Sequence, residues 1–108
     1  MPIFIKTEKF KNNTLELSNN ERKKFLLMHK EWVKKMNKEG HYIQSGYLIN
    51  EKKIPGGGGL LILEAKDYLT AKKIIANDPM IKNDLVNWDL QEWISIDRRE
   101  PKFSNHLG

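Results

Sequence analysis

Residues 42–65 read YIQSGYLINEKKIPGGGGLLILEA, and this stretch decides the fold. Its two ends, residues 42–49 and 60–65, are rich in the β-branched, aromatic and aliphatic side chains that favour strands. Residues 50–59 between them carry two lysines, a proline and four consecutive glycines, which predict a flexible hairpin loop. Two strands in direct succession therefore stand at the centre of the chain.

A helix is predicted immediately before these strands. Ser18 and Glu21 have the spacing of a capping box, in which the serine accepts a hydrogen bond from a free backbone amide. Apolar residues then recur at intervals of three and four, while lysines mostly occupy the other side. Gly40 suits the left-handed turn that ends a helix, so we expect an amphipathic helix up to about this residue.

A second helix is predicted after the central strands. Asp67 can cap it, and the apolar spacing continues to about Asn77. Asp78 precedes Pro79, and a residue before proline avoids helical geometry, so the helix should stop here. Pro79 is suited to begin another short turn.

The outermost elements are strands. Residues 3–10 begin with Ile3, Phe4 and Ile5, and apolar residues alternate with polar ones from Val86 to Ile96. The order β, α, β, β, α, β predicts a ferredoxin-like α+β domain over residues 1–97, followed by a polar tail over residues 98–108. Its four-stranded antiparallel sheet would carry both helices on one face.

The other face of this sheet needs a cover. The strand at residues 60–65 is apolar on both sides, which predicts that both faces of the sheet are buried, and Trp93 falls on the otherwise polar side of the last strand. On a monomer these side chains would form an exposed apolar patch. We therefore expect a homodimer that packs sheet against sheet.

Composition limits the class of protein. A chain of 108 residues fits one domain, and a formal net charge of +5 favours anionic ligands or partners. The absence of cysteine excludes disulfides, thiol nucleophiles and cysteine-ligated zinc. No signal-peptide core and no membrane span is recognisable, so a cytoplasmic location without membrane contact is expected.

Two side chains are candidates for chemistry. His29 interrupts the apolar stripe of the first helix with a group that can take and give a proton. The alternative is a histidine at the edge of the core, bonded to a backbone carbonyl. Asp78 could orient such an imidazole, although a helix cap before proline also explains it. His41 and His106 are weaker candidates.

Other patterns concern a binding pocket. Gly46 lies within a strand pattern, which indicates either a bulge or the close approach of a ligand or backbone. Aromatic side chains could line a site for an aromatic substrate or belong to the core, namely Trp32, Tyr42, Tyr47, Trp88 and Trp93. Paired histidines at metal spacing, a serine nucleophile elbow and a dinucleotide fingerprint are all lacking, so no metal or cofactor is predicted.

Several short motifs together resemble the YciI-like family. They are His29, residues 45–48 (SGYL), residues 59–65 (GLLILEA) and residues 76–79 (ANDP), and the resemblance covers roughly residues 3–96. It implies a dimeric α+β barrel whose first-helix histidine and Asp-Pro aspartate, here His29 and Asp78, form a catalytic pair. Where the family usually has Gly-Pro, this chain has Gly46-Tyr47, so its pocket wall differs. A few members resemble dehydrochlorinases or lactone isomerases.

The resulting hypothesis is a homodimeric small-molecule enzyme or binding protein. His29 would act as general base or acid, Asp78 would hold its tautomer, and Gly46 and Tyr47 would contact the ligand. A single pair without cofactor suits proton abstraction, giving isomerisation or elimination. One alternative is an RNA-binding module of the RRM type, which shares the βαββαβ order. Such modules stack bases on aromatic side chains, however, and residues 60–65 contain none. The other alternative is a non-catalytic interaction subunit.

Overall fold

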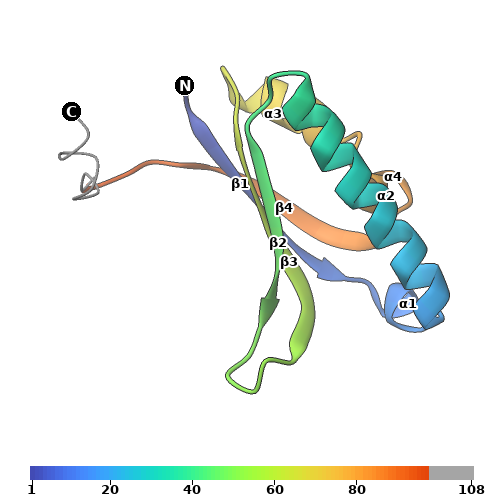
Figure 1. The fold of residues 1–108 in the computed structure, drawn as a ribbon. Coiled ribbons are helices and arrows are strands. Elements are labelled where there is room, and N and C mark those ends of the chain that lie inside the picture. The colour runs from blue at the N-terminus through green and yellow to red at the C-terminus, as the bar shows by residue number, and fades with distance from the viewer. Residues whose placement is uncertain (98–108) are drawn as a thin grey trace, which may run out of the picture.

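Four strands form one antiparallel sheet, and the helices pack against one of its faces (Figure 1). The computed structural model describes residues 1–97. In chain order the elements are β1 (Ile3–Phe10), α1 (Asn12–Leu15), α2 (Asn19–Lys38), β2 (Ile43–Ile49), β3 (Pro55–Glu64), α3 (Tyr68–Ile75), α4 (Pro79–Lys82) and β4 (Val86–Trp93). This confirms the ferredoxin-like prediction. The predicted tail, residues 98–108, lies outside the described residues.

The strand order in the sheet is β2-β3-β1-β4, so β1 and β3 are central and β2 is an edge. Phe4 of β1 pairs with Leu63 of β3, and Lys6 pairs with Leu61. Because successive side chains of a strand alternate between faces, Phe4, Lys6 and Glu8 all point to the side of the sheet that the helices cover. This alternation places two charged residues on the core face of β1.

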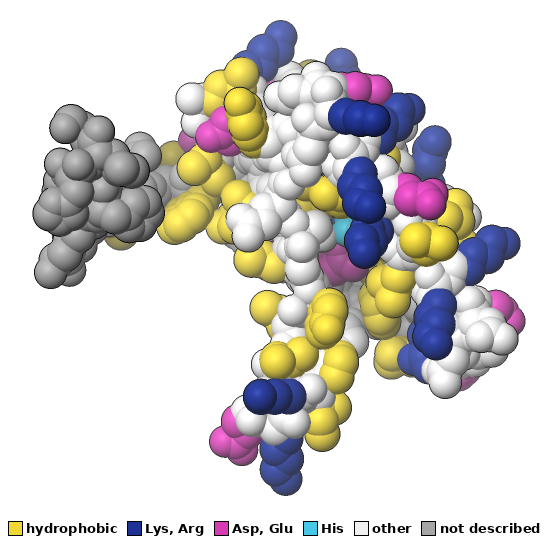
Figure 2. Space-filling view, viewed as in Figure 1, with side chains coloured by type: hydrophobic (Ala, Val, Ile, Leu, Met, Phe, Trp, Pro, Cys, Tyr) yellow, Lys and Arg dark blue, Asp and Glu magenta, His cyan; other side chains and the backbone are white. Residues whose placement is uncertain are grey.

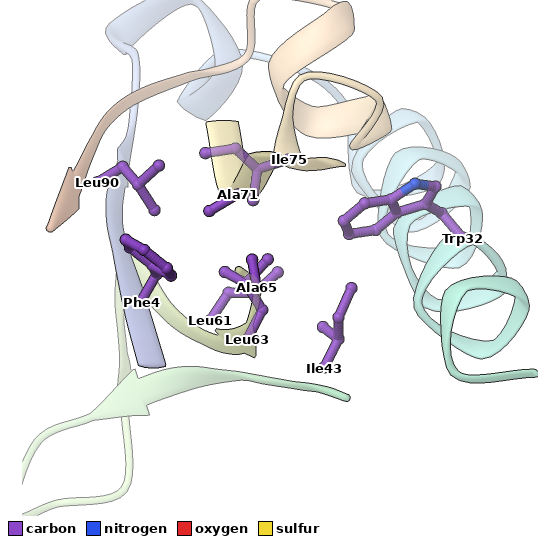
Figure 3. Packing of buried hydrophobic residues seen from close by; sticks show 9 residues of the cluster. All are labelled: Phe4, Trp32, Ile43, Leu61, Leu63, Ala65, Ala71, Ile75 and Leu90. Carbon is purple, nitrogen blue, oxygen red and sulfur yellow. The ribbon is translucent and has the colours of Figure 1, made fainter. Parts of the chain in front are cut away.

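The main core lies between the sheet and the helices, as Figure 3 shows. Strand residues on the helix face meet the inward side of α3 and the indole of Trp32 from α2. The buried cluster comprises Phe4, Trp32, Ile43, Leu61, Leu63, Ala65, Ala71, Ile75 and Leu90. These are the apolar positions whose spacing predicted the strands and helices.

The predicted starts of the two helices are confirmed, and α2 and α3 end two residues before the predicted points. The Ser18 hydroxyl accepts a hydrogen bond from the Glu21 amide at 3.2 Å and caps α2, which ends two residues before Gly40. Gly40 has a φ of +94°, the left-handed region where a side chain is disfavoured. Asp67 caps α3 by accepting from the Thr70 amide at 2.8 Å.

The prediction of a flexible loop through Gly59 was wrong. Only residues 50–54 form the connection, and β3 begins at Pro55 with the glycines inside it. A Cβ on Gly58 would lie 2.7 Å from the Glu8 carbonyl oxygen, and one on Gly59 would lie 2.9 Å from the Gly46 carbonyl oxygen. These glycines allow neighbouring strands to approach closely, which explains why they fall in a strand.

Two other element predictions need correction. The short helix α1 was not predicted. It holds Thr14, whose hydroxyl donates a hydrogen bond to the distant Leu85 carbonyl at 2.6 Å. Strand β4 ends at Trp93 rather than at Ile96, because β1 offers no pairing partner beyond Ile3. Ile94 and Ile96 are exposed.

The face of the sheet opposite the helices is not fully buried in the single chain. Its apolar side chains Ile3, Ile5, Leu60 and Ile62 are half-buried, and Trp93 is 54% exposed. The prediction that both faces are buried therefore fails for one copy of the chain. Among residues 1–97, the helices are all too short or too polar to cross a membrane.

Candidate functional site

His29 joins two side chains that come from distant parts of the sequence. Its Nδ1 lies 2.8 Å from the Asp78 Oδ1 atom, and its Nε2 lies 2.8 Å from the Ser45 Oγ atom. Helix α2 supplies the histidine, the edge strand β2 supplies the serine, and the start of α4 supplies the aspartate. Both predicted catalytic residues are therefore in direct contact, and both ring nitrogens bind side chains rather than a backbone carbonyl.

Asp78 is fixed from several sides. Its Oδ1 atom also accepts a hydrogen bond from the Met80 amide at 3.0 Å, so it caps α4, with Pro79 in the first helical position. Its Oδ2 atom accepts from the Lys6 ammonium at 2.8 Å, and the carboxylate has no exposed surface. The two roles considered for Asp78, helix cap and partner of His29, are both present.

Lys6 is a fully buried cation. Its ammonium lies between two carboxylates, 2.8 Å from Asp78 and 2.6 Å from Glu8. A buried charge is tolerated when it is paired and hydrogen-bonded, which both contacts provide. Lys6 therefore anchors Asp78 from behind, on the side away from His29.

The pKa of Asp78 reflects these contacts. Burial acts to raise this pKa, because it disfavours the charged carboxylate. The hydrogen bond from His29 and the positive charge of Lys6 together outweigh burial and hold the pKa of Asp78 below its ordinary value of 3.8. Asp78 is therefore an anion at neutral pH.

An ionised Asp78 determines which nitrogen of His29 carries the proton. A carboxylate can only accept hydrogen bonds, so Nδ1 must donate to it. In the neutral ring Nε2 then has a free electron pair and accepts from the Ser45 hydroxyl. The arrangement fits a base whose reactive atom is Nε2.

His29 and Ser45 both line a cavity of about 480 Å³ between α2 and the β2–β3 hairpin. Figure 2 shows a hollow between the helix and the projecting hairpin, with hydrophobic side chains on the hairpin. The lining residues are Glu8, Phe10, Leu26, His29, Lys30, Val33, Lys34, Ser45, Gly46, Tyr47, Gly58, Gly59 and Met80. The volume falls within the range of about 300–1,000 Å³ usual for small-molecule sites.

The predicted ligand contacts Gly46 and Tyr47 both line this cavity. The strand pairs regularly at Gly46, and the irregularity comes later, between Tyr47 and Ile49. A Cβ on Gly46 would meet no atom within 4 Å, so nothing in the single chain requires glycine there. Of the other aromatic candidates, Trp32 belongs to the core, Trp88 is half-buried against it, Trp93 is on the open face and Tyr42 is exposed.

The site also contains residues that the sequence did not point to. Lys6 and Glu8 were not considered, and Ser45 was noted only as part of a motif. The sequence does indicate that Lys6 is buried, because it follows Phe4 by two residues and therefore lies on the core face of the same strand. Within residues 1–97, no three His, Asp or Glu side chains gather closely enough to hold a metal ion.

Comparison with solved structures shows relatives with this fold. A 5-chloro-2-hydroxyhydroquinone dehydrochlorinase (TftG) from Burkholderia phenoliruptrix AC1100, in complex with 2,5-dihydroxybenzoquinone, superposes with a TM-score of 0.63. It is 20% identical, and the match covers 85% of this chain and 93% of that chain. An antibiotic biosynthesis monooxygenase gives a TM-score of 0.55 at 14% identity, covering 90% of this chain and 100% of its own. At these identities the likeness concerns the fold alone.

Comparison of sequences assigns the family. No curated protein matches the chain. The family model of the YCII-related domain matches residues 3–94, a range that includes every described strand and helix. The match includes His29, Ser45 and Asp78. The chain belongs to the YCII-related domain family.

Proposed function

We propose that the protein is a small-molecule enzyme in which His29 moves a proton and Asp78 positions its ring. The observation that carries this proposal is the His29 imidazole, whose Nδ1 atom lies 2.8 Å from the buried, anionic Asp78 and which also lines a ligand-sized cavity. A base held in one tautomer beside a ligand-sized cavity is the arrangement that general acid–base catalysis needs.

The chemistry follows from the tautomer. His29 Nε2 takes a proton from an activated carbon of the substrate, and the electron pair of the broken C–H bond forms a new double bond. The reaction ends as an elimination if a leaving group departs with its electrons. It ends as an isomerisation if the imidazolium returns the proton to another atom. Asp78 stabilises the imidazolium in both cases.

The dehydrochlorinase among the structural relatives supports this reaction class. A dehydrochlorinase removes hydrogen chloride from its substrate, which amounts to removal of a proton and departure of chloride. The same single base can perform this step without a redox change. We therefore propose that the protein catalyses the elimination or isomerisation of small cyclic compounds.

The test compares two histidine variants. The first substrate is 5-chloro-2-hydroxyhydroquinone, whose turnover is measured as released chloride. The others are cyclic ketones and lactones in D₂O, whose proton exchange is measured by NMR. His29→Asn should lower turnover by about 10²–10⁴-fold, the usual contribution of a general base, while circular dichroism stays native. His41→Asn, a histidine that does not line the cavity, is the control. Full activity of His29→Asn would refute the proposal.

A second candidate is acyl transfer, which the contact between Ser45 and His29 favours. A hydroxyl bound to an imidazole that is itself bound to a carboxylate is the signature of an activated serine nucleophile. Ser45→Ala separates the two candidates. The variant should retain turnover within about tenfold if His29 acts on the substrate, whereas mass-spectrometric acylation of Ser45 by p-nitrophenyl acetate would favour acyl transfer.

We further propose that two copies pack through the open sheet face. The support is the apolar character of this face, where Ile5 and Ile62 are half-buried and Trp93 is 54% exposed. A small domain often gains stability by covering such a surface. The homodimer also accounts for the apolar face better than RNA binding, because Trp93 is the lone aromatic side chain there among the described strand residues.

A further inference from the structure

Two lysines stand at the mouth of the cavity beside His29. Lys30 and Lys34 lie four residues apart on α2, so they are neighbours on one side of the helix, and both line the cavity and are exposed. Within residues 1–97, no carboxylate oxygen lies within 4.0 Å of either ammonium. Figure 2 shows Lys and Arg side chains gathered along this helix beside the hollow.

The one acidic side chain that lines the cavity does not offset this charge. Glu8 is already paired, since its Oε1 atom lies 2.6 Å from the buried Lys6 ammonium. Asp78 lies behind His29, with no exposed surface, and does not line the cavity. The mouth therefore presents two unpaired positive charges, a field that attracts and orients an anion.

Most of the remaining wall is apolar, apart from His29 and the hydroxyl groups of Ser45 and Tyr47. Phe10, Leu26, Val33 and Met80 contribute hydrocarbon or thioether surface, and Gly58 and Gly59 contribute backbone without side chains. Such a wall favours an apolar ligand body over a sugar or a peptide, because most of the many hydroxyl or amide groups of those ligands would lack partners there. A ligand that suits both parts has an apolar ring and one anionic group.

We propose that the site takes a small cyclic organic acid, whose anionic group binds Lys30 and Lys34 while its ring lies against the apolar wall next to His29. This inference rests on the proposed function and names its substrate class. Fixing the acid group at one end would leave the ring within reach of the Nε2 atom. Positioning of this kind is what a single general base requires.

The test uses an acid and its neutral isostere, 1-naphthoate and 1-naphthamide, with the full chain. Calorimetry at low salt should show that the acid binds about fivefold more tightly, as expected for two solvent-exposed ion pairs. NMR shifts should locate both compounds near Gly58 and Gly59. The preference should weaken at high salt, because screening acts on exposed charges.

Two double variants of the same helix supply the comparison. Lys30→Gln with Lys34→Gln should remove the preference for the acid and leave naphthamide binding unchanged. Lys23→Gln with Lys35→Gln changes the net charge equally but away from the cavity, and should keep the preference. Equal affinity of acid and amide for the native chain would overturn the inference, as would absence of binding or loss of the preference in the control pair.

These measurements concern binding, so they separate the inference from the proposed chemistry. Selective binding of the acid together with full turnover in His29→Asn would refute the catalytic proposal and leave the ligand class standing. The reverse result, loss of turnover in His29→Asn without selectivity for the acid, would refute the ligand class alone.

Discussion

Replacing Lys6 with methionine tests the charge arrangement behind the site. The substitution keeps an unbranched apolar stem but removes the ammonium between two carboxylates. Breaking a buried ion pair in this way costs about 3–5 kcal/mol. We expect a loss of about 3 kcal/mol, at the lower end, because His29 and the Met80 amide still bind Asp78. A domain of this size is stable by about 5–15 kcal/mol, so the loss is large.

The pH dependence identifies the cause of this loss. In the native chain the pKa of Asp78 is held below 3.8, so its stabilising effect is present above the unfolded pKa of about 3.9 and disappears as the pH falls through the folded pKa. Without Lys6 the charge and the hydrogen bond of its ammonium no longer lower the pKa of Asp78, so this pKa rises. Asp78 then takes up a proton at a higher pH, which relieves the unpaired charge. The stability difference between the two proteins should therefore shrink from pH 7 toward about pH 4.

Urea unfolding at several pH values measures both effects. Lys9→Met is the matched control, because Lys9 is exposed on the same strand and should change the free energy of unfolding by no more than about 0.5 kcal/mol. Asp78→Asn combined with Lys6→Met should cost less than the sum of the two single changes, since the partners are coupled. A loss under about 1 kcal/mol at pH 7, or one that stays constant toward pH 4, would refute the reasoning.

Three further predictions concern the fold and assembly. Gly59→Ala should lower the free energy of unfolding in urea by about 1–3 kcal/mol, because its Cβ would lie 2.9 Å from a carbonyl oxygen. Gly46→Ala should have little effect in a monomer, and equal effects of the two changes would contradict this reasoning. Ser18→Ala should cost about 1 kcal/mol through loss of the α2 cap, and an unchanged melting temperature would argue against that role. Trp93→Glu should halve the mass that light scattering measures for a native dimer, and a native mass of 12.7 kDa would refute dimerisation.

Local patterns in the sequence were sufficient for most of the fold. The caps at Ser18 and Asp67 act on neighbouring amides, so their signals are contained in a few residues. The glycines at the start of β3 were misread because their role depends on Glu8 and Gly46, which are distant in sequence. The helix α1 was missed for the same reason, since its buried Thr14 is held by a carbonyl far along the chain.

The candidate site divides in the same way. His29 and Asp78 were named because one interrupts an apolar stripe and the other precedes a proline, and both matched a family motif. Lys6 was overlooked because a lysine normally favours the surface, and its burial depends on two carboxylates that only the folded sheet brings near. The alternation of side chains after Phe4 places Lys6 on the core face of the sheet. Alternation alone does not show which carboxylates pair with a buried lysine.

The formal charges of Lys6 and its two carboxylate partners favour His29 as a base. Asp78 and Glu8 each contribute one negative charge and Lys6 one positive charge, which leaves one negative charge beside a neutral imidazole. When Nε2 accepts a proton, the imidazolium supplies the missing positive charge. Low-dielectric surroundings penalise an unbalanced charge, so the group is balanced in the state that follows proton abstraction. Lys6 prevents an excess of two negative charges, and His29 cancels the one that remains when it takes the proton of the substrate.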